Sequence, residues 1–209
     1  MWIWLLALLI GGYFLGCLHG SVLAQKLSGV NLKETGTKNA GASNVTIVLG
    51  KKFGALVAAI DIGKGTLAVL LSRYILERVG LPEDIAWLLL FVVGAAVVLG
   101  HVFPFHMKFN GGKGTATIIG MLLAIDWRFG LIGLGLFIVV AIVTDFLVFG
   151  VLMLYITLIA IAIWIAPGIW PPIIALGLFI IAIVKHVENI KHIKNGEEKL
   201  VSSVFGKKK

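Results

Sequence analysis

The chain has 209 residues, 59% of them hydrophobic, and a mean hydropathy of +1.05. Soluble domains contain about 45–50% apolar residues, so this composition excludes an ordinary soluble domain and indicates a bundle of transmembrane helices. The net charge of +8 does not indicate nucleic-acid binding, because lysine and arginine in a membrane protein mark cytoplasmic loops and anionic lipid surfaces. We expect a single polytopic, all-α membrane domain over residues 1–209.

The first predicted span covers residues 2–24. It lacks the basic start of a signal peptide, so we expect it to be retained as a helix. Gly12, Gly16 and Gly20 recur at intervals of four residues and form a ridge of small residues that lets another helix pack closely. His19 near the inner end is interpreted as a polar contact between helices, with a place in a site as the alternative.

A polar loop is expected at residues 25–52, where five lysines accompany one glutamate. This basic excess predicts that the loop is cytoplasmic and that the N-terminus lies outside. The segment 36–44 within it is rich in glycine, hydroxyl and amide groups. A long connection of this kind is either functional or a solvated turn, and both interpretations stay open here.

The second span, 53–72, carries Asp61 and Lys64 near its centre. Each central charge costs about 2.5–3.5 kcal/mol to insert, whereas a large aliphatic side chain returns only about 0.3–0.6 kcal/mol. Because their spacing is i and i+3, the two side chains share a helix face and are predicted to pair inside the bundle. Such a pair is either structural or part of a functional site.

The rest of the chain alternates apolar segments with short polar turns. A loop outside the membrane is expected at 73–84, and the C-terminal lysines 207–209 are expected to contact anionic lipid. The remaining apolar segments are 85–103, 115–125, 129–143, 147–166 and 173–184. About seven transmembrane helices are therefore expected, with the N-terminus outside and the C-terminus in the cytoplasm.

A glycine-rich turn lies in the stretch 100–117, where Gly111, Gly112 and Gly114 flank Lys113. Glycines let backbone N–H groups approach a ligand because no Cβ intervenes. With an ammonium beside them and a helix start just after, they form an anion trap, and we predict that the anion is phosphate. The alternative is a flexible turn whose lysine faces lipid headgroups.

The polar segment that follows the last span contains a candidate base. If the helix continues, His186 and Asn189 share a face while Glu188 points elsewhere. A histidine beside an amide can bind or deprotonate a hydroxyl, and polar residues at a helix end are the alternative. The five histidines lack ligand spacing with carboxylates, so no metal is expected.

By this topology three site loops, at about 25–52, 104–114 and 185–200, face the cytoplasm. Two anion-friendly glycine loops and a candidate base at a membrane surface indicate transfer between phosphorylated, lipid-bound partners. Residue chemistry alone does not identify those partners. The sequence contains no dinucleotide fingerprint and no defensible Ser-His-Asp pattern.

Four blocks carry a resemblance to a known family, and they are 39–44 with 49–52, 61–65, 100–104 with 109–117, and 186–190. In these blocks the chain resembles the bacterial PlsY family of acyl-phosphate:glycerol-3-phosphate acyltransferases. The resemblance implies transfer of a fatty acyl group from acyl-phosphate to the 1-position of glycerol 3-phosphate, without a metal or other cofactor. The products would be lysophosphatidic acid and phosphate, in the first step of phospholipid synthesis.

Residue chemistry and the resemblance together predict the site. The predicted catalytic residues are Thr37, Lys113, His186 and Asn189. The predicted substrate-binding residues are Lys38, Asn39, Gly41, Asn44, Lys64, His101, Gly111, Gly112 and Gly114. Asp61 and Glu188 are predicted to be structural. The expected partners are acyl-phosphate, glycerol 3-phosphate and membrane lipids, with no nucleic acid, at a site facing the cytoplasm from the bacterial inner membrane.

The chain departs from the family pattern at several positions. Asn31, Lys33 and Lys38 replace family residues in the first loop, Ile47 replaces an arginine, and Val148 lies where the family has a serine-containing segment. Lysine keeps the positive charge of arginine but cannot form its paired, bidentate hydrogen bonds. We therefore interpret the chain as a divergent member. The alternatives are a lipid-phosphate-binding relative, non-catalytic or with another substrate, and a small membrane transporter.

Overall fold

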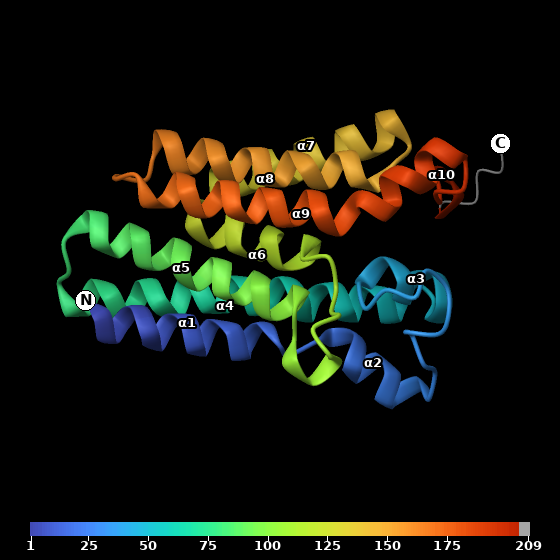
Figure 1. The fold of residues 1–209 in the computed structure, drawn as a ribbon, viewed down its shortest axis with the longest axis horizontal. Coiled ribbons are helices and arrows are strands. Elements are labelled where there is room, and N and C mark those ends of the chain that lie inside the picture. Colours follow the sequence, from blue (N-terminus) through green and yellow to red (C-terminus); the bar gives the residue numbers. More distant parts are fainter. Residues whose placement is uncertain (205–209) are drawn as a thin grey trace.

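The computed structural model describes residues 1–204, and every regular element within them is a helix. The elements are α1 (Trp2–Gly16), α2 (Gly20–Ser28), α3 (Ala42–Leu49), α4 (Lys51–Val79), α5 (Glu83–Val102), η1 (Phe105–Met107), α6 (Thr115–Ile125), α7 (Trp127–Thr144), α8 (Leu147–Trp164), α9 (Trp170–Asn195) and α10 (Val201–Val204). The long helices follow the long axis of the molecule, and α1 starts at the end opposite α10 (Figure 1). The predicted all-α architecture is confirmed, whereas lysines 207–209 lie outside the described residues.

Six stretches of the described chain are long and apolar enough to cross a membrane, by length and composition. They are 2–28, 51–79, 83–107, 127–144, 147–164 and 170–195. The expected fourth span is α6, whose 11 residues extend only about 16 Å against a hydrocarbon core of about 30 Å. It is enclosed by other helices and most of its residues are buried, so α6 is an internal helix that does not reach across on its own.

Glycines determine how closely the central helices approach. A Cβ on Gly120 of α6 would clash with the carbonyl of Ile62 on α4, and a Cβ on Gly65 would clash with the carbonyl of Thr117. The predicted ridge on the first span also packs against neighbours, since Gly16 touches the α5 backbone. These contacts pack α4 closely against α6, and α1 closely against α5.

The first span is not the continuous helix that was expected over 2–24. Helix α1 ends at Gly16, residues 17–19 leave the helical path, and α2 starts at Gly20. The break frees backbone carbonyls inside the bundle, where unpaired groups are costly. Lys64 of α4 donates hydrogen bonds to two of these carbonyls, those of Gly16 and Leu18.

Three other boundaries differ from expectation. Helix α4 continues to Val79, so most of the expected loop 73–84 is helical, and Arg73 donates to the carbonyl of Ile125 at the end of α6 at 2.6 Å. The expected loop 25–52 contains α3. Helix α9 continues to Asn195 and thus places His186 on a helix, which is the condition under which His186 and Asn189 were predicted to share a face.

The loops that follow α2, α5, α7 and α9 lie toward one end of the molecule, on the right in Figure 1. Lys33 in the loop after α2 contacts the carbonyl of Asn110 in the loop after α5. Ser202 of α10 donates to Asp145 at the α7–α8 junction at 2.7 Å. Segments far apart in the sequence therefore surround a common space.

Candidate active site

A cavity of about 510 Å³ lies at the loop-rich end. It is lined by members of all three predicted site segments, namely Thr37, Asn39, Gly41, Lys113, Gly114, His186, Glu188 and Asn189, together with Asp61 and His101. A second hollow, of about 360 Å³, lies at the α4–α5 turn and contains none of these residues. The fold therefore collects most of the predicted site residues in one place.

The Lys113 side chain reaches across this cavity to α9. Its ammonium contacts Asn189 Oδ1, and Asn189 Nδ2 in turn donates to Glu198 Oε1 at 2.6 Å. Burial lowers the pKa of Lys113 below that of an ordinary lysine, while Glu198 and then Glu188 oppose the shift. The cavity thus holds a partly desolvated cation, which suits an anionic ligand.

His186 lies one helical turn before Asn189 and is 4% exposed. Its Nδ1 is 2.8 Å from the carbonyl of Ala182, an acceptor, so we assign the proton to Nδ1 and leave Nε2 as an acceptor. This bond fixes the ring on the face of α9 that lines the cavity. A neutral imidazole held in this way is equipped to accept a hydrogen bond from a hydroxyl.

Two helix N-termini border the cavity. Gly114 and the first residues of α6 line it, and so do Gly41 and the first residues of α3. The first-turn N–H groups of a helix have no acceptor within the helix, and the N-terminus carries a partial positive charge. Both helices therefore favour an anion in the cavity.

Gly111 and Gly112 do not act as predicted. Their amides donate to the carbonyls of Val102 and His101, each at 3.1 Å, and neither residue lines the cavity. The prediction that these two amides hold phosphate is therefore corrected. Glycine is required for packing instead, because a Cβ on Gly112 would clash with the His101 ring.

Asn44 does not line the cavity either, and instead holds the loop that does. It is fully buried, and its Nδ2 donates to the carbonyls of Leu32, Thr35 and Asn39 at 2.9–3.2 Å. Its Oδ1 accepts from the Thr37 amide at 2.7 Å. One side chain thus shapes the loop that carries Thr37 and Asn39.

Replacing Asn44 with alanine removes all four of these bonds. We expect the 32–39 loop to open and to be cleaved at least tenfold faster in limited proteolysis, because buried polar backbone groups lose their partners. Replacing the exposed Asn31 with alanine removes only one such bond, which its Oδ1 accepts from the Lys33 amide, and provides an amide control in the same loop. Equal cleavage of both variants would contradict the role of Asn44.

Lys38 lies outside the cavity. Its side chain is exposed and its backbone is left-handed, with φ of 55°. A non-glycine residue in this conformation is uncommon, and the neighbouring bonds of Asn44 hold the loop in place. The predicted contact between Lys38 and substrate has no counterpart in the cavity lining.

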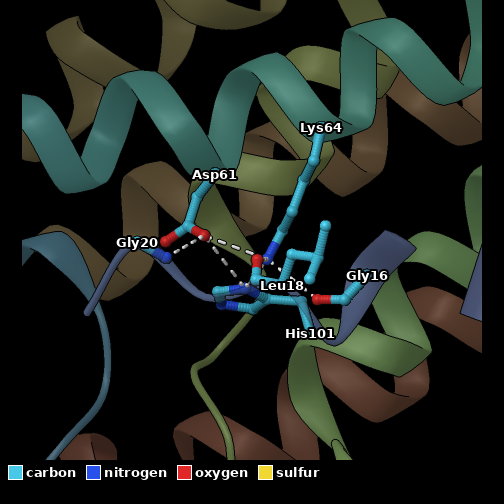
Figure 2. Close-up of polar contacts among 6 residues, drawn as sticks. All are labelled: Gly16, Leu18, Gly20, Asp61, Lys64 and His101. Atoms are coloured by element: carbon cyan, nitrogen blue, oxygen red, sulfur yellow. Dashed lines mark hydrogen bonds and ion pairs between the residues drawn. The ribbon is translucent and has the colours of Figure 1, made fainter. Parts of the chain in front are cut away.

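Asp61 and Lys64 form the predicted ion pair, 2.9 Å apart and almost fully buried. Lys64 Nζ also donates to the carbonyls of Gly16 and Leu18 at 2.9 and 2.8 Å, and lies 2.8 Å from His101 Nδ1 (Figure 2). All its donors are directed at protein acceptors. The predicted role of Lys64 in binding substrate is corrected, because it instead neutralises the broken end of α1.

The same cluster also contacts the start of α2, on the other side of the break after α1. Asp61 Oδ1 lies 3.4 Å from the Gly20 amide at the start of α2, and 3.6 Å from His101 Nδ1 (Figure 2). A cation at the end of α1 and an anion at the start of α2 both suit the helix dipoles. Because the His101 ring packs against Gly112, the cluster also supports the glycine turn that carries Lys113.

The fold also creates a cluster that sequence spacing did not predict. Ligand atoms of His19, Asp61 and His101 lie within 4.8 Å of one another, and neither ring nitrogen of His19 has a partner within residues 1–204. The prediction of no metal rested on sequence spacing, which does not reveal this group, because its members come from the α1–α2 break, α4 and α5. The Lys64 ammonium already occupies the position between Asp61 and His101.

Several lining residues were missed by sequence reasoning. Glu198, His192 and Lys199 come from the end of α9 and the segment after it, where the sequence shows only ordinary surface polarity. An apolar wall was missed as well, formed by Ile62, Ile119, Phe137, Val148 and Val151. The cavity thus combines a charged end with an apolar side.

Comparison with known proteins identifies the family. The model of the glycerol-3-phosphate acyltransferase family matches residues 6–196. The chain belongs to this family. The resemblance predicted from four sequence blocks is confirmed.

Among family relatives, glycerol-3-phosphate acyltransferase 1 of Oceanobacillus iheyensis is 46% identical over 197 residues, covering 94% of this chain and 95% of that protein. Glycerol-3-phosphate acyltransferase of Synechococcus elongatus is 36% identical over 195 residues, covering 93% and 90%. The crystal structure of PlsY (YgiH), an integral membrane glycerol 3-phosphate acyltransferase, in its glycerol 3-phosphate form, matches with a TM-score of 0.82 at 30% identity over 94% of each chain. The chain is therefore a multi-pass membrane acyltransferase of this family.

Proposed function

We propose that this protein transfers a fatty acyl group from acyl-phosphate to the 1-hydroxyl of glycerol 3-phosphate, releasing lysophosphatidic acid and inorganic phosphate. The observation that carries the proposal is the cavity in which Lys113, His186, Asn189 and two helix N-termini meet. The matched solved structures are of PlsY in glycerol 3-phosphate and lysophosphatidic acid forms. A cavity with this chemistry suits both a phosphorylated acceptor and a phosphorylated donor.

The reaction needs no nucleophile from the protein. The acceptor hydroxyl oxygen attacks the carbonyl carbon of the acyl-phosphate, the bond from that carbon to the bridging phosphate oxygen breaks, and phosphate leaves with the electron pair. The hydroxyl proton passes to the leaving phosphate or to His186. The protein contributes by placing two anions side by side and stabilising charge as it moves from carbonyl to phosphate.

The individual residues have separable tasks in this scheme. Lys113 and the α6 N-terminus bind one phosphate, and the α3 N-terminus contributes further positive potential on the other side of the cavity. Asn189 and the Nε2 of His186 orient the acceptor hydroxyl. Thr37 and Asn39 close the polar end.

The apolar side of the cavity accommodates the fatty chain. Ile62, Ile119 and Phe137 line it, and Leu147 and Ile47 at its edge are about one-third exposed, at 36% and 37%. Exposed aliphatic residues on a membrane-spanning bundle contact lipid, so the acyl chain enters from the bilayer while its phosphate stays at the polar end.

The orientation in the membrane follows from charge. The lysine-rich loops lie at the cavity end, which we assign to the cytoplasmic face of the bacterial inner membrane, with the N-terminus outside. Labelling single cysteines introduced at positions 35 and 168 in intact cells tests this assignment. Reagent that does not cross the membrane should modify only the second position.

The function is tested by measuring phosphate release from acyl-phosphate by the purified protein. Release is expected only when glycerol 3-phosphate is present, and lysophosphatidic acid should accumulate in equal amount. No release above that of a Lys113→Ala variant would overturn the proposal. Substrate binding without turnover would favour a non-catalytic relative, because Ile47 and Val148 line the cavity where the family pattern has arginine and serine.

Replacing Gly112 with alanine is expected to raise KM for glycerol 3-phosphate about 10- to 100-fold. The added Cβ clashes with the His101 ring, so the turn carrying Lys113 must shift. Steady-state kinetics of phosphate release provides the measurement. Gly135→Ala on α7 is the matched control, since a Cβ there meets nothing within 4 Å. An unchanged KM for the Gly112 variant would contradict the packing argument.

A further inference from the structure

A C-terminal strap, residues 196–203, runs from the end of α9 to the α7–α8 junction. Gly196, with φ of 74°, turns the chain, and the amides of Glu197 and Glu198 donate to the carbonyl of His192 at 2.8 and 3.3 Å. At the other end the Val201 amide donates to the carbonyl of Asp145 at 2.9 Å. The strap is therefore anchored at both ends beside the cavity.

Glu197, Glu198 and Lys199 of the strap line the cavity, and Glu198 is the one that contacts Asn189. The side chain of Glu198 is only 12% exposed, and its Oε1 accepts from Asn189 Nδ2 at 2.6 Å. Its Oε2 lies 3.6 Å from His192 Nδ1. A carboxylate enclosed to this degree is costly unless it has partners, so its placement is specific.

The contact with Glu198 determines how the Asn189 amide is oriented. An amide presents an acceptor on one side and donors on the other, and the two orientations have similar shape. Because Nδ2 faces the Glu198 carboxylate, Oδ1 faces the Lys113 ammonium. A flipped amide would direct N–H groups at the ammonium and its oxygen at the carboxylate, and both contacts would be repulsive.

We propose that Glu198 is a positioning residue for the acyl transfer, which fixes Asn189 and thereby holds the Lys113 ammonium in the cavity. This inference rests on the proposed function for its kinetic consequence but not for its structural one. The contact chain runs from the strap through α9 to the glycine turn.

The charges that face Lys113 indicate what loss of Glu198 would do. Glu198 and Glu188 raise the Lys113 pKa, whereas burial and Lys185 lower it, and His186 lies on the same face of α9. Glu198 has the larger effect of the two carboxylates. Its removal therefore makes Lys113 lose its proton at lower pH.

The test compares Glu198→Ala, Glu198→Gln and the charge-matched control Glu34→Gln in the full-length protein. Glu34 is an exposed carboxylate that does not line the cavity. We expect Glu198→Ala to lower kcat/KM at least tenfold. Glu198→Gln should restore most of the loss, because its amide oxygen still accepts from Asn189, but it should move the alkaline limb of the pH profile to lower pH. Glu34→Gln should stay within about twofold of the wild type.

A second measurement does not depend on activity. Trace labelling of lysine amines at a series of pH values, read by mass spectrometry, reports the pKa of Lys113 directly. The pKa of Lys113 should fall in both Glu198 variants and not in the Glu34 variant. An unchanged pKa of Lys113 in the Glu198 variants would overturn the inference. Equal kinetic losses in the alanine and glutamine variants would overturn it as well. An inactive wild type whose Lys113 titration still responds to Glu198 would instead count against the proposed function alone.

Discussion

Replacing Lys113 with alanine is expected to lower kcat/KM for glycerol 3-phosphate-dependent phosphate release about 10²- to 10³-fold. The loss corresponds to roughly 2.7–4 kcal/mol, the usual cost of removing one preorganised donor that stabilises developing charge. The ammonium is the charged group that the glycine turn carries into the cavity. The measurement is steady-state kinetics with both substrates varied, because loss of an anion contact affects KM and kcat differently.

Lys52→Ala is the control for this change, since Lys52 is an exposed lysine in the first turn of α4 and does not line the cavity. It should leave the kinetics unchanged.

The Lys113→Arg variant separates the effect of the positive charge from the effect of its titration. The pKa of Lys113 is lowered by burial, so its charge, and with it anion affinity, is lost as pH rises through that lowered value. Arginine does not titrate in this range, and its variant should lack the alkaline limb. A Lys113→Ala enzyme with wild-type kinetics would refute this assignment.

Replacing Lys64 with methionine is expected to destabilise the protein by about 3–5 kcal/mol, the range for breaking a buried ion pair by removing one partner. The change leaves the carboxylate of Asp61 buried without its cation and frees the carbonyls of Gly16 and Leu18. Thermal unfolding in detergent should show a clear fall in Tm. The measurement tests structure directly, because no donor of Lys64 is available to a substrate.

The double variant Lys64→Met with Asp61→Asn should recover part of this loss, since no charge is then left unpaired. Lys52→Met serves as the exposed control and should leave Tm unchanged. If Lys64→Met were as stable as Lys52→Met, the cluster would not hold the broken span together, and the support it gives to His101 and the glycine turn would have to come from elsewhere.

Much of the site was predictable because the necessary patterns are short. A spacing of i and i+3 predicted that Asp61 pairs with Lys64, and the pair is 2.9 Å apart. The same spacing predicted that His186 and Asn189 share a face if α9 continues, which it does to Asn195. Apolar length predicted the six spans, whereas the segment 115–125, also expected to span, is the short internal helix α6.

The sequence by itself therefore determined the helical class, the family and which chemical groups are present, since these depend on periodicity and on local motifs. The tertiary structure alone decided which partners those groups use. It directed the Gly112 amide to His101, closed Asn44 on its own loop, and brought Glu198 to Asn189. Each buried donor must find an acceptor, and the acceptor within reach depends on how loops and helix ends fold back on one another. Helical periodicity does not specify that folding, so these contacts could be seen only in the tertiary structure.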